Sequence, residues 1–254
     1  MAIDLFSIGR FTVHGYGLMI GLGFLAAVLV GGKLSKRRDL SDSDFTNLAM
    51  LVLVLGFLGG KILHIIVEFR AFLADPLAIL GSEGFVVYGG ILSGIATIYG
   101  YCRIKKLVFI DYLDLFAASV PINQALGRIG CLLAGCCYGK RTESSFALVF
   151  PEGAIAPAGV KLLPTQPIMA AGDFIMFVIL VVLWLKFGKE YRGLETAGYL
   201  LLYSLGRFLV EFLRDDERGA VGLLTTSQFI AVFTFIAGVI LLIRVLKNKD
   251  RDKE

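Results

Sequence analysis

The sequence is poor in charged residues, which make up only 18% of its 254 positions, whereas hydrophobic residues make up 57%. Its mean hydropathy of +0.78 lies well above that of an ordinary soluble domain. This scarcity of charge excludes a soluble globular protein. It indicates an integral membrane protein, because so much apolar surface is stable only in lipid.

Cysteine and histidine are also scarce, with four and two residues respectively. Four cysteines do not make a disulfide framework, although Cys131 could pair with Cys136 or Cys137 in an oxidising exterior. The C-x4-CC spacing of these three lacks the histidines or the second cysteine pair of a zinc site, so we expect no metal. Small-residue packing is their simpler role, and a nucleophilic Cys131, one turn from Arg128, is the alternative.

Cofactor motifs are absent from the sequence as well. The segments GRIG and GFLGG lack the strand–turn–helix context of a phosphate-binding loop, so we expect no nucleotide and no other cofactor. The first apolar run is not expected to be a cleaved signal peptide, because it follows Asp4, has little basic charge before it and ends in GGKLSKRR.

Seven apolar runs are each long enough to cross a bilayer core, which takes about 20 helical residues. We expect these spans at 12–32, 45–67, 85–101, 113–136, 168–187, 194–213 and 223–246. The predicted fold is an all-α integral membrane protein, a bundle of about seven transmembrane helices. Residues 1–254 are expected to form a single polytopic membrane domain with a longer external loop near 137–167.

Basic residues in the connections predict the orientation, since cytoplasmic loops carry an excess of Lys and Arg. On one side the connections carry four, three, three and five: Lys33, Lys36, Arg37 and Arg38; Arg103, Lys105 and Lys106; Lys186, Lys189 and Arg192; Arg244, Lys247, Lys249, Arg251 and Lys253. On the other they carry one, one, three and two: Arg10; Arg70; Lys140, Arg141 and Lys161; Arg214 and Arg218. The N-terminus is therefore expected outside and the C-terminus in the cytoplasm. The net charge of +4 indicates contact with anionic membrane lipids and no nucleic acid.

Two arginines, Arg128 and Arg207, lie inside apolar spans. Arginine cannot shed its charge, so at membrane depth it must face a cavity, water or an anion, and the commonest anion in a bilayer is a lipid phosphate. Arg207 could instead form a structural ion pair with Glu211, four residues later on the same helix face. Arg214, with its acidic neighbours, is expected to form a solvated cluster at the membrane rim.

Polar residues from at least five segments are expected in the outer leaflet. They are His14, Tyr16, Tyr88, Arg128, Arg207, Glu211, Thr225, Thr226, Ser227 and Gln228, together with PTQP before the fifth span. The glycines of YGGILSG either pack helices together or let the backbone approach a ligand. His64, four residues before Glu68, is expected to be a satisfied interior histidine, with a catalytic base as the alternative. This clustering predicts a site that opens to the outer leaflet.

Eight segments, in order, resemble a known family: FTVHGYGLMIGLGF, GGKILHIIVE, DPLAIL, GFVVYGGILSG, GRIGCLLAGCCYGK, PTQP, YSLGRFLVEFLRDD and LTTSQF. With them the chain resembles the prolipoprotein diacylglyceryl transferases over nearly its whole length. The resemblance implies a multi-pass protein of the bacterial cytoplasmic (inner) membrane. It also implies transfer of the diacylglyceryl group of phosphatidylglycerol to the lipobox cysteine of a prolipoprotein signal peptide, with a thioether formed and glycerol phosphate released.

The resemblance implies catalytic roles for Arg128, Arg207 and Tyr88. It implies a substrate-binding set of Arg128, Tyr203, Arg207, Glu211, Gly89, Gly90, Tyr16 and Gln166. Fixed cations suit the task, because the leaving phosphate's charge must be held in a dry cavity.

Two positions depart from the family's pattern. Tyr88 stands where the family has the histidine of HGG, and Cys131 stands where it has an asparagine after GRxG. Either the thiol needs no base, or another group such as His14 or His64 serves, or the chain is a paralogue with a different acceptor. We expect Tyr88 to position the substrate by hydrogen bonding, since a phenol with a pKa near ~10 is a poor base.

The main alternative to a transferase is a lipid or small-anion transporter that uses Arg128 and Arg207 as substrate clamps. Transporters commonly contain internal repeats and broken helices, and the two halves of this sequence show no convincing repeat. A non-catalytic relative of the transferases is the third possibility. The sequence favours the enzyme.

Overall fold

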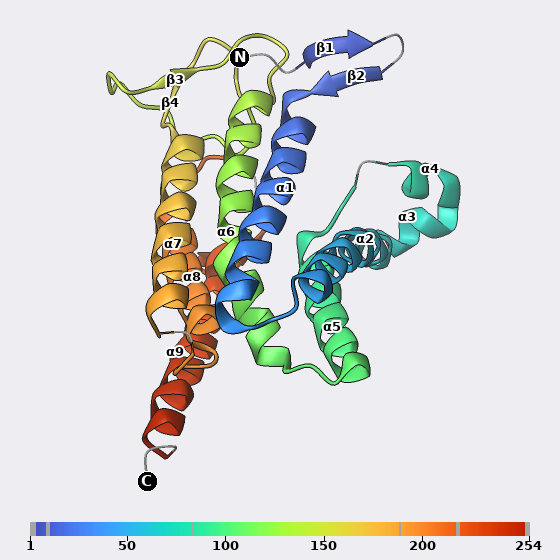
Figure 1. Ribbon diagram of the computed structural model, residues 1–254. Coiled ribbons are helices and arrows are strands. Elements are labelled where there is room, and N and C mark those ends of the chain that lie inside the picture. Colours follow the sequence, from blue (N-terminus) through green and yellow to red (C-terminus); the bar gives the residue numbers. More distant parts are fainter. Residues whose placement is uncertain (1–3, 9–10, 83, 188, 217–218, 252–254) are drawn as a thin grey trace. The chain divides into compact units, whose positions relative to one another are not determined.

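The structure is a computed structural model, and it describes the chain except for residues 1–3, 9–10, 83, 188, 217–218 and 252–254 (Figure 1). Three residues named above, Arg10, Arg218 and Lys253, lie outside the described residues, as does Glu217, one of the acidic neighbours of Arg214. The chain forms two compact units. Unit 1 comprises Met1–Leu34 and Asp114–Glu254, and unit 2 comprises Ser35–Leu113.

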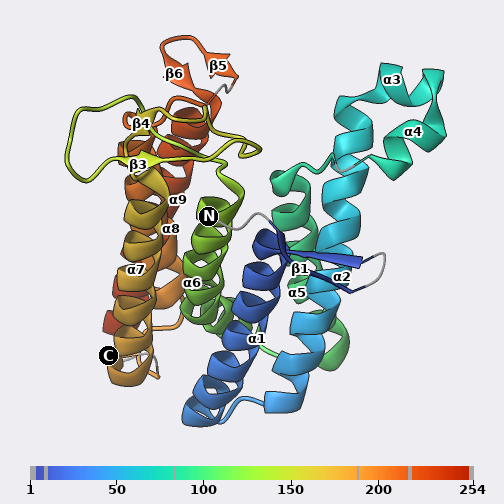
Figure 2. The same cartoon turned by 90° about the horizontal axis from the view of Figure 1, so that it is seen from above.

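Unit 1 is a group of helices joined by short β-hairpins. Its elements are β1 (Asp4–Ile8), β2 (Phe11–His14), α1 (Gly15–Ser35), most of α6 (Phe109–Ala134), β3 (Leu148–Val149), β4 (Lys161–Leu162), α7 (Thr165–Phe187), α8 (Leu194–Glu211), β5 (Ala220–Val221), β6 (Leu224–Thr225) and α9 (Thr226–Arg251). Helix α8 packs against both α7 and α9. The antiparallel hairpins β3–β4 and β5–β6 lead directly into α7 and α9 (Figure 2).

Unit 2 is built around one pair of long helices, α2 and α5. Its elements are the 3-10 turn η1 (Lys36–Arg38), α2 (Asp42–Val67), α3 (Phe69–Ala74), α4 (Pro76–Gly81) and α5 (Val87–Lys105). Glycines bring the two long helices together: a Cβ on Gly89 would collide with the backbone carbonyl of Gly59, and Gly90 lies against Gly56. Small residues allow this close backbone approach between membrane helices.

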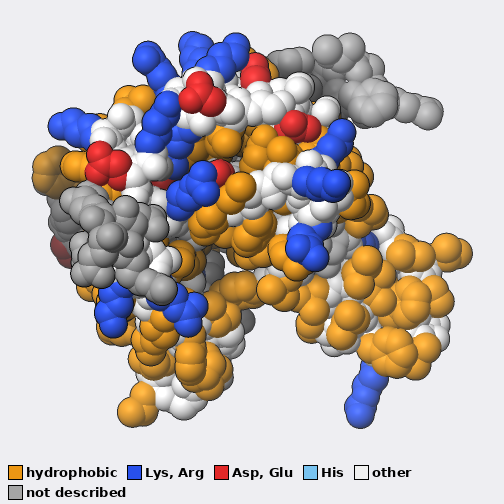
Figure 3. All heavy atoms as spheres, turned by 60° about the horizontal axis from the view of Figure 1, so that its bottom comes forward, with side chains coloured by type: hydrophobic (Ala, Val, Ile, Leu, Met, Phe, Trp, Pro, Cys, Tyr) orange, Lys and Arg blue, Asp and Glu red, His pale blue; other side chains and the backbone are white. Residues whose placement is uncertain are grey.

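The chain is a predominantly helical integral membrane protein. Within the described residues, four helices are long and apolar enough to cross a membrane: Gly15–Arg38, Asp42–Val67, Thr165–Phe187 and Thr226–Asn248. Helices α5, α6 and α8 occupy the other three predicted runs. A helix pairs its backbone N–H and C=O groups internally, and it must do so in lipid because lipid offers them no hydrogen-bond partners. Large apolar side chains such as Phe57, which is 65% exposed, face outward, and hydrophobic side chains cover much of the surface (Figure 3).

Three predicted spans begin two or three residues later than the sequence suggested, at α1, α5 and α9. Residues Phe11–His14 form strand β2 paired with β1, so the first helix starts at Gly15. Helix α9 starts at Thr226, because Thr225 and Gln228 form a capping box. The Gln228 N–H donates to Thr225 Oγ1 and the Thr225 N–H donates to Gln228 Oε1, both at 3.2 Å. These two polar residues therefore cap the start of α9, a role that the hydropathy pattern did not reveal.

A buried carboxylate fastens α6 to the start of α8. Asp114 is fully buried, and its Oδ1 accepts hydrogen bonds from the backbone N–H of Thr196 at 2.9 Å and from Thr196 Oγ1 at 2.6 Å. Its Oδ2 accepts from the N–H of Gly193, the residue before α8. The carboxylate thus satisfies N-terminal amides that have no partner within the helix.

Candidate active site

Arg128 and Arg207, both in unit 1, line one cavity of about 440 Å³. Arg128 comes from α6 and Arg207 from α8, and the polar residues Asp173 and Tyr203 also line it. The remaining lining is apolar or glycine: Ile168, Met169, Gly172, Ile175, Met176, Ile179, Leu202, Leu205, Gly206, Leu209, Val210 and Leu213. The cavity therefore combines two cations with a mostly apolar wall.

Arg128 has an acidic partner that the sequence reasoning missed. Its Nε lies 3.6 Å from Oδ2 of Asp173 on α7, with side chains 21% and 12% exposed respectively. No acid lies within one turn of Arg128 on its own helix, so proximity along the chain could not reveal the pair. The available signal was Asp173 itself, an ionisable residue inside an apolar span.

Arg207 is held by two residues. Its Nη2 lies 2.8 Å from Oε2 of Glu211 and donates a 2.8 Å hydrogen bond to Oγ of Ser227 on α9. The ion pair considered from the sequence is therefore present, and Glu211 is buried with it. Because both partners fix the guanidinium, Arg207 is oriented before any ligand arrives.

A pair of tyrosines continues the polar face of α8. The rings of Tyr199 and Tyr203 are stacked, with centroids 5.5 Å apart and planes 4° apart. Gln124 Nε2 on α6 donates to the Tyr199 hydroxyl at 2.8 Å. Tyr203 in turn interacts electrostatically with Arg128. The stack thus ties α6 to α8 beside the cavity.

The cavity lies toward the end of unit 1 where the loop after α6 returns. This loop is fastened to both neighbouring helices: Thr165 Oγ1 donates to the Cys137 carbonyl at 2.9 Å, and the Lys140 N–H donates to the Leu213 carbonyl at 2.9 Å. Gln166 is fully buried and its Nε2 donates to the Cys136 carbonyl at 2.8 Å. The structure therefore gives Gln166 a loop-fastening contact, and it is not among the residues that line the cavity.

Two other expected site residues, Tyr16 and Glu211, are not among the residues that line the cavity. Tyr16, on α1, packs against Gly130 of α6 and interacts electrostatically with Arg128. Glu211 contacts Arg207 and is outside the cavity lining. Both are adjacent to an arginine of the cavity, and substrate contact by either stays a prediction.

Tyr88, Gly89 and Gly90 belong to unit 2, at the start of α5. Gly89 and Gly90 serve the packing of α5 on α2, which is one of the two roles expected for them. Tyr88 is 41% exposed, and its role at the reacting end of a substrate stays a prediction.

The segment before Tyr88 is fastened by Lys61 of α2. Its ammonium donates to the Ser82 carbonyl at 2.6 Å and to the Gly84 carbonyl at 3.4 Å. His64 lies on the same side, with Nε2 3.4 Å from Ser82 Oγ. Within unit 2 these residues hold the loop that leads into α5, which agrees with a structural role for His64.

Comparisons with known proteins identify the family of the chain. A family model described as prolipoprotein diacylglyceryl transferase matches residues 4–244. The phosphatidylglycerol–prolipoprotein diacylglyceryl transferase 2 of Clostridium perfringens is 43% identical over 254 residues, which covers 99% of this chain and 98% of the relative. The phosphatidylglycerol–prolipoprotein diacylglyceryl transferase of Clostridium tetani is 42% identical over 237 residues, covering 92% and 94% respectively. The chain belongs to this family.

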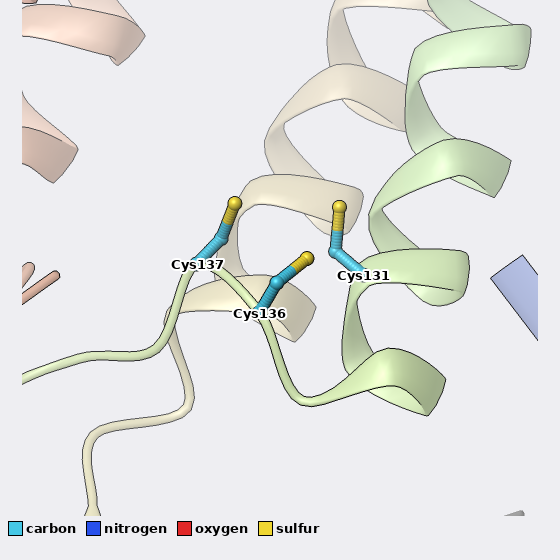
Figure 4. A group of neighbouring side chains, drawn as sticks. All are labelled: Cys131, Cys136 and Cys137. Carbon is cyan, nitrogen blue, oxygen red and sulfur yellow. The ribbon is translucent and has the colours of Figure 1, made fainter. Parts of the chain in front are cut away.

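Cys131, one of the two departures from the pattern of the prolipoprotein diacylglyceryl transferases, lies in a group of three thiols. The Sγ atoms of Cys131, Cys136 and Cys137 all lie within 4.8 Å of one another (Figure 4). Cys131 is buried at the end of α6, and the other two are half-buried in the loop that follows. The described cysteines form no disulfide.

Arg214 lies beside this group, and the expectation that it forms a solvated cluster was wrong. Its side chain is only 2% exposed, and it donates from Nε to Asp216 Oδ1 at 2.8 Å and from Nη2 to Asp216 Oδ2 at 2.6 Å. The chain beyond α8 folds back over the loop, with Gly139 bridged to Arg214, and this covers the guanidinium. Burial opposes its charge, but Asp216 and the neighbouring Cys137 hold the pKa of Arg214 above its usual range.

Charge and hydrogen bonding raise the pKa of Arg214 but lower the pKa of Cys137. Hydrogen bonds from the thiols of Cys131 and Cys136, assisted by the Arg214 guanidinium, lower the pKa of the Cys137 thiol below its usual range. Burial opposes this effect, and the surrounding donors outweigh it.

Proposed function

We propose that the chain transfers the diacylglyceryl group of phosphatidylglycerol to the lipobox cysteine thiol of a prolipoprotein. The observation that carries the proposal is the cavity of about 440 Å³ in which Arg128 and Arg207 converge from two helices within an apolar wall. The names of the relatives support the same substrates. An apolar wall suits acyl chains, while the two guanidiniums suit a phosphate.

The proposed reaction is the one that the family resemblance implies. The lipobox thiol loses its proton to solvent, the thiolate sulfur attacks the glycerol carbon that carries the phosphate, the carbon–oxygen bond breaks, and its electron pair leaves with glycerol phosphate. The phosphodiester carries one negative charge, whereas the departing monoester gains a second. Arg128 and Arg207 therefore stabilise the transition state more than the bound lipid, which is the condition for a rate enhancement.

The remaining residues position these groups. Asp173 orients Arg128, while Glu211 and Ser227 orient Arg207. Tyr203 lines the cavity between them and can donate its hydroxyl to a phosphate oxygen. Tyr16 and Gln166 in unit 1, and Gly89 and Gly90 in unit 2, keep the substrate-binding roles that the resemblance implies, and Tyr88 is proposed to position the reacting end of the lipid.

The proposed topology has seven transmembrane spans, in a single polytopic domain, with the N-terminus outside and the C-terminus in the cytoplasm of a bacterial cell. The ends of α6 and α8 near the cavity then face the outer leaflet, where a prolipoprotein signal peptide presents its lipobox. Cysteine-accessibility labelling should find Lys105 inside and Glu152, in the loop after α6, outside. Labelling of Glu152 from the cytoplasm would reverse the orientation.

The activity is tested with purified protein in lipid nanodiscs that contain phosphatidylglycerol, incubated with a lipobox peptide. Mass spectrometry should find a diacylglyceryl mass on the peptide cysteine, together with released glycerol phosphate. Nanodiscs without phosphatidylglycerol, and a peptide with serine in place of the lipobox cysteine, are the controls. Uptake of lipid or anion into vesicles without peptide modification would instead favour the transporter.

A further inference from the structure

The group of three thiols at the end of α6 is not used in the transfer reaction proposed above. Figure 4 shows the sulfur atoms of Cys131, Cys136 and Cys137 turned toward a common space, one from the last turns of α6 and two from the loop. A disulfide would use two of these sulfurs, whereas the arrangement brings three together. Three converging thiols are the donor set of a thiophilic metal ion.

The helix ending explains why the C-x4-C spacing brings two of the thiols together. The N–H of Cys136 donates to the Cys131 carbonyl at 3.1 Å, and the N–H of Gly135 donates to the Leu132 carbonyl at 3.2 Å. With Gly135 at φ +71°, these bonds make a Schellman motif, in which the side chains at the Cys131 and Cys136 positions are neighbours. Cys137 then adopts φ +60°, an unusual conformation for a residue other than glycine, and its thiol joins the pair.

The backbone that carries the loop thiols is fixed by the next helix. Thr165 Oγ1 and Gln166 Nε2, from the first turn of α7, hold the carbonyls of Cys137 and Cys136 at 2.9 and 2.8 Å. Both side chains are fully buried. The three thiols therefore come from a fastened segment, which lowers the entropic cost of bringing them to one ion.

The surrounding charge suits an anionic thiolate centre. Arg128 interacts electrostatically with Cys131 and Cys137, and Arg214 also interacts with Cys137. Asp216 neutralises part of the Arg214 charge, so that the region does not repel a cation strongly. Three thiolates around one mono- or divalent ion carry a net negative charge, which these arginines compensate.

We propose that Cys131, Cys136 and Cys137 bind one thiophilic cation, Zn²⁺ or Cu⁺. Metal–sulfur bonds of about 2.3 Å would set the three sulfurs roughly 4 Å apart, so the separations of up to 4.8 Å need only a small closure. Binding releases the thiol protons and involves no oxidation or reduction. Three protein ligands leave a further position for water on Zn²⁺, whereas Cu⁺ is satisfied by three sulfurs. The C-x4-CC spacing alone did not predict this site, because the third thiol reaches it only through the left-handed turn at Cys137.

The test uses full-length protein with an affinity tag free of histidine, purified in detergent under anaerobic, reducing conditions. Co²⁺ replaces Zn²⁺ as a spectroscopic probe, since thiolate ligands give it intense charge-transfer absorption, and Cu⁺ is delivered in competition with a chromophoric chelator. We expect one equivalent of at least one ion per chain. Cys136→Ser and Cys137→Ser should lose this equivalent, while Cys102→Ser, in α5, should keep it.

A second measurement needs no variant and so does not depend on folding of the mutants. Alkylation of the wild-type thiols, followed by peptide mass spectrometry, should show Cys131, Cys136 and Cys137 protected together by the ion. Absence of a stoichiometric ion, equal binding by the cluster variants and Cys102→Ser, or a disulfide within the group in anaerobic protein would each overturn the proposal. Because the readouts are metal content and protection, they are independent of whether the chain transfers diacylglyceryl groups.

Discussion

Arg128→Ala is the substitution that tests the phosphate-binding role of the cavity most directly. Arg207 is paired with Glu211 at 2.8 Å, whereas Arg128 contacts Asp173 at the longer distance of 3.6 Å. Arg128 therefore offers more uncompensated charge to a phosphate. Removal of one such donor from an oxyanion site typically costs about 10²–10³ in kcat, or roughly 3–4 kcal/mol. We expect Arg128→Ala to fall in this range, with KM changed less than kcat because the second phosphate charge develops during bond cleavage.

The same variant leaves Asp173 without its cation inside the cavity. A carboxylate about 5–6 Å from a bound phosphate repels it by on the order of 1–3 kcal/mol at the effective dielectric of a protein site. We therefore expect the double variant Arg128→Ala with Asp173→Ala to be roughly tenfold more active than Arg128→Ala alone. A purely structural ion pair would also be rescued by removal of both partners, so turnover is compared per folded protein, with the melting temperature of each variant measured in detergent.

The assay is glycerol phosphate release from phosphatidylglycerol in nanodiscs, with lipobox peptide varied to separate kcat from KM. Arg128→Lys keeps the charge but loses the planar fork, and it should lie between alanine and wild type. Arg103→Ala, at an exposed position near the end of α5, is the matched control and should behave like wild type. Near-normal turnover of Arg128→Ala, or a double variant no better than the single, would refute the reasoning.

Three further substitutions test other parts of the structure. Asp114→Ala removes the buried carboxylate that caps α8 and should destabilise the protein by about 1–3 kcal/mol. This loss should appear as a lower melting temperature in detergent. Asp215→Ala, at an exposed position, should leave the melting temperature unchanged. Lys61→Met frees the Ser82 and Gly84 carbonyls before α5 and should lower transfer activity, whereas Lys36→Met, at a surface ion pair, should not. Tyr88→Phe should reduce transfer without moving its pH optimum, and Tyr88→His should be tolerated; wild-type behaviour of Tyr88→Phe would leave it a packing role.

The helices could be predicted because their signal is local. Each of the seven apolar runs coincides with a long helix within a few residues, since hydrophobic content alone decides which segments leave water. The ends were less predictable, as at Thr225, because a capping box or a hairpin depends on a few side-chain hydrogen bonds rather than on average hydropathy. The sequence did not predict the short helices α3 and α4 or the hairpins, for the same reason.

The partners of the buried charges could not be read from one helix at a time. Arg128 meets Asp173 across α6 and α7, and Arg214 meets the thiol of Cys137 only after the chain beyond α8 folds back. Within one turn of the chain, which is the range of helical i,i+4 pairs, the sequence shows only Glu211 for Arg207 and the acidic neighbours of Arg214. In a membrane bundle an isolated ionisable residue on one apolar helix implies a counterpart on another, because neither is stable alone in lipid. Matching such residues between helices, rather than along them, would have paired Asp173 with Arg128.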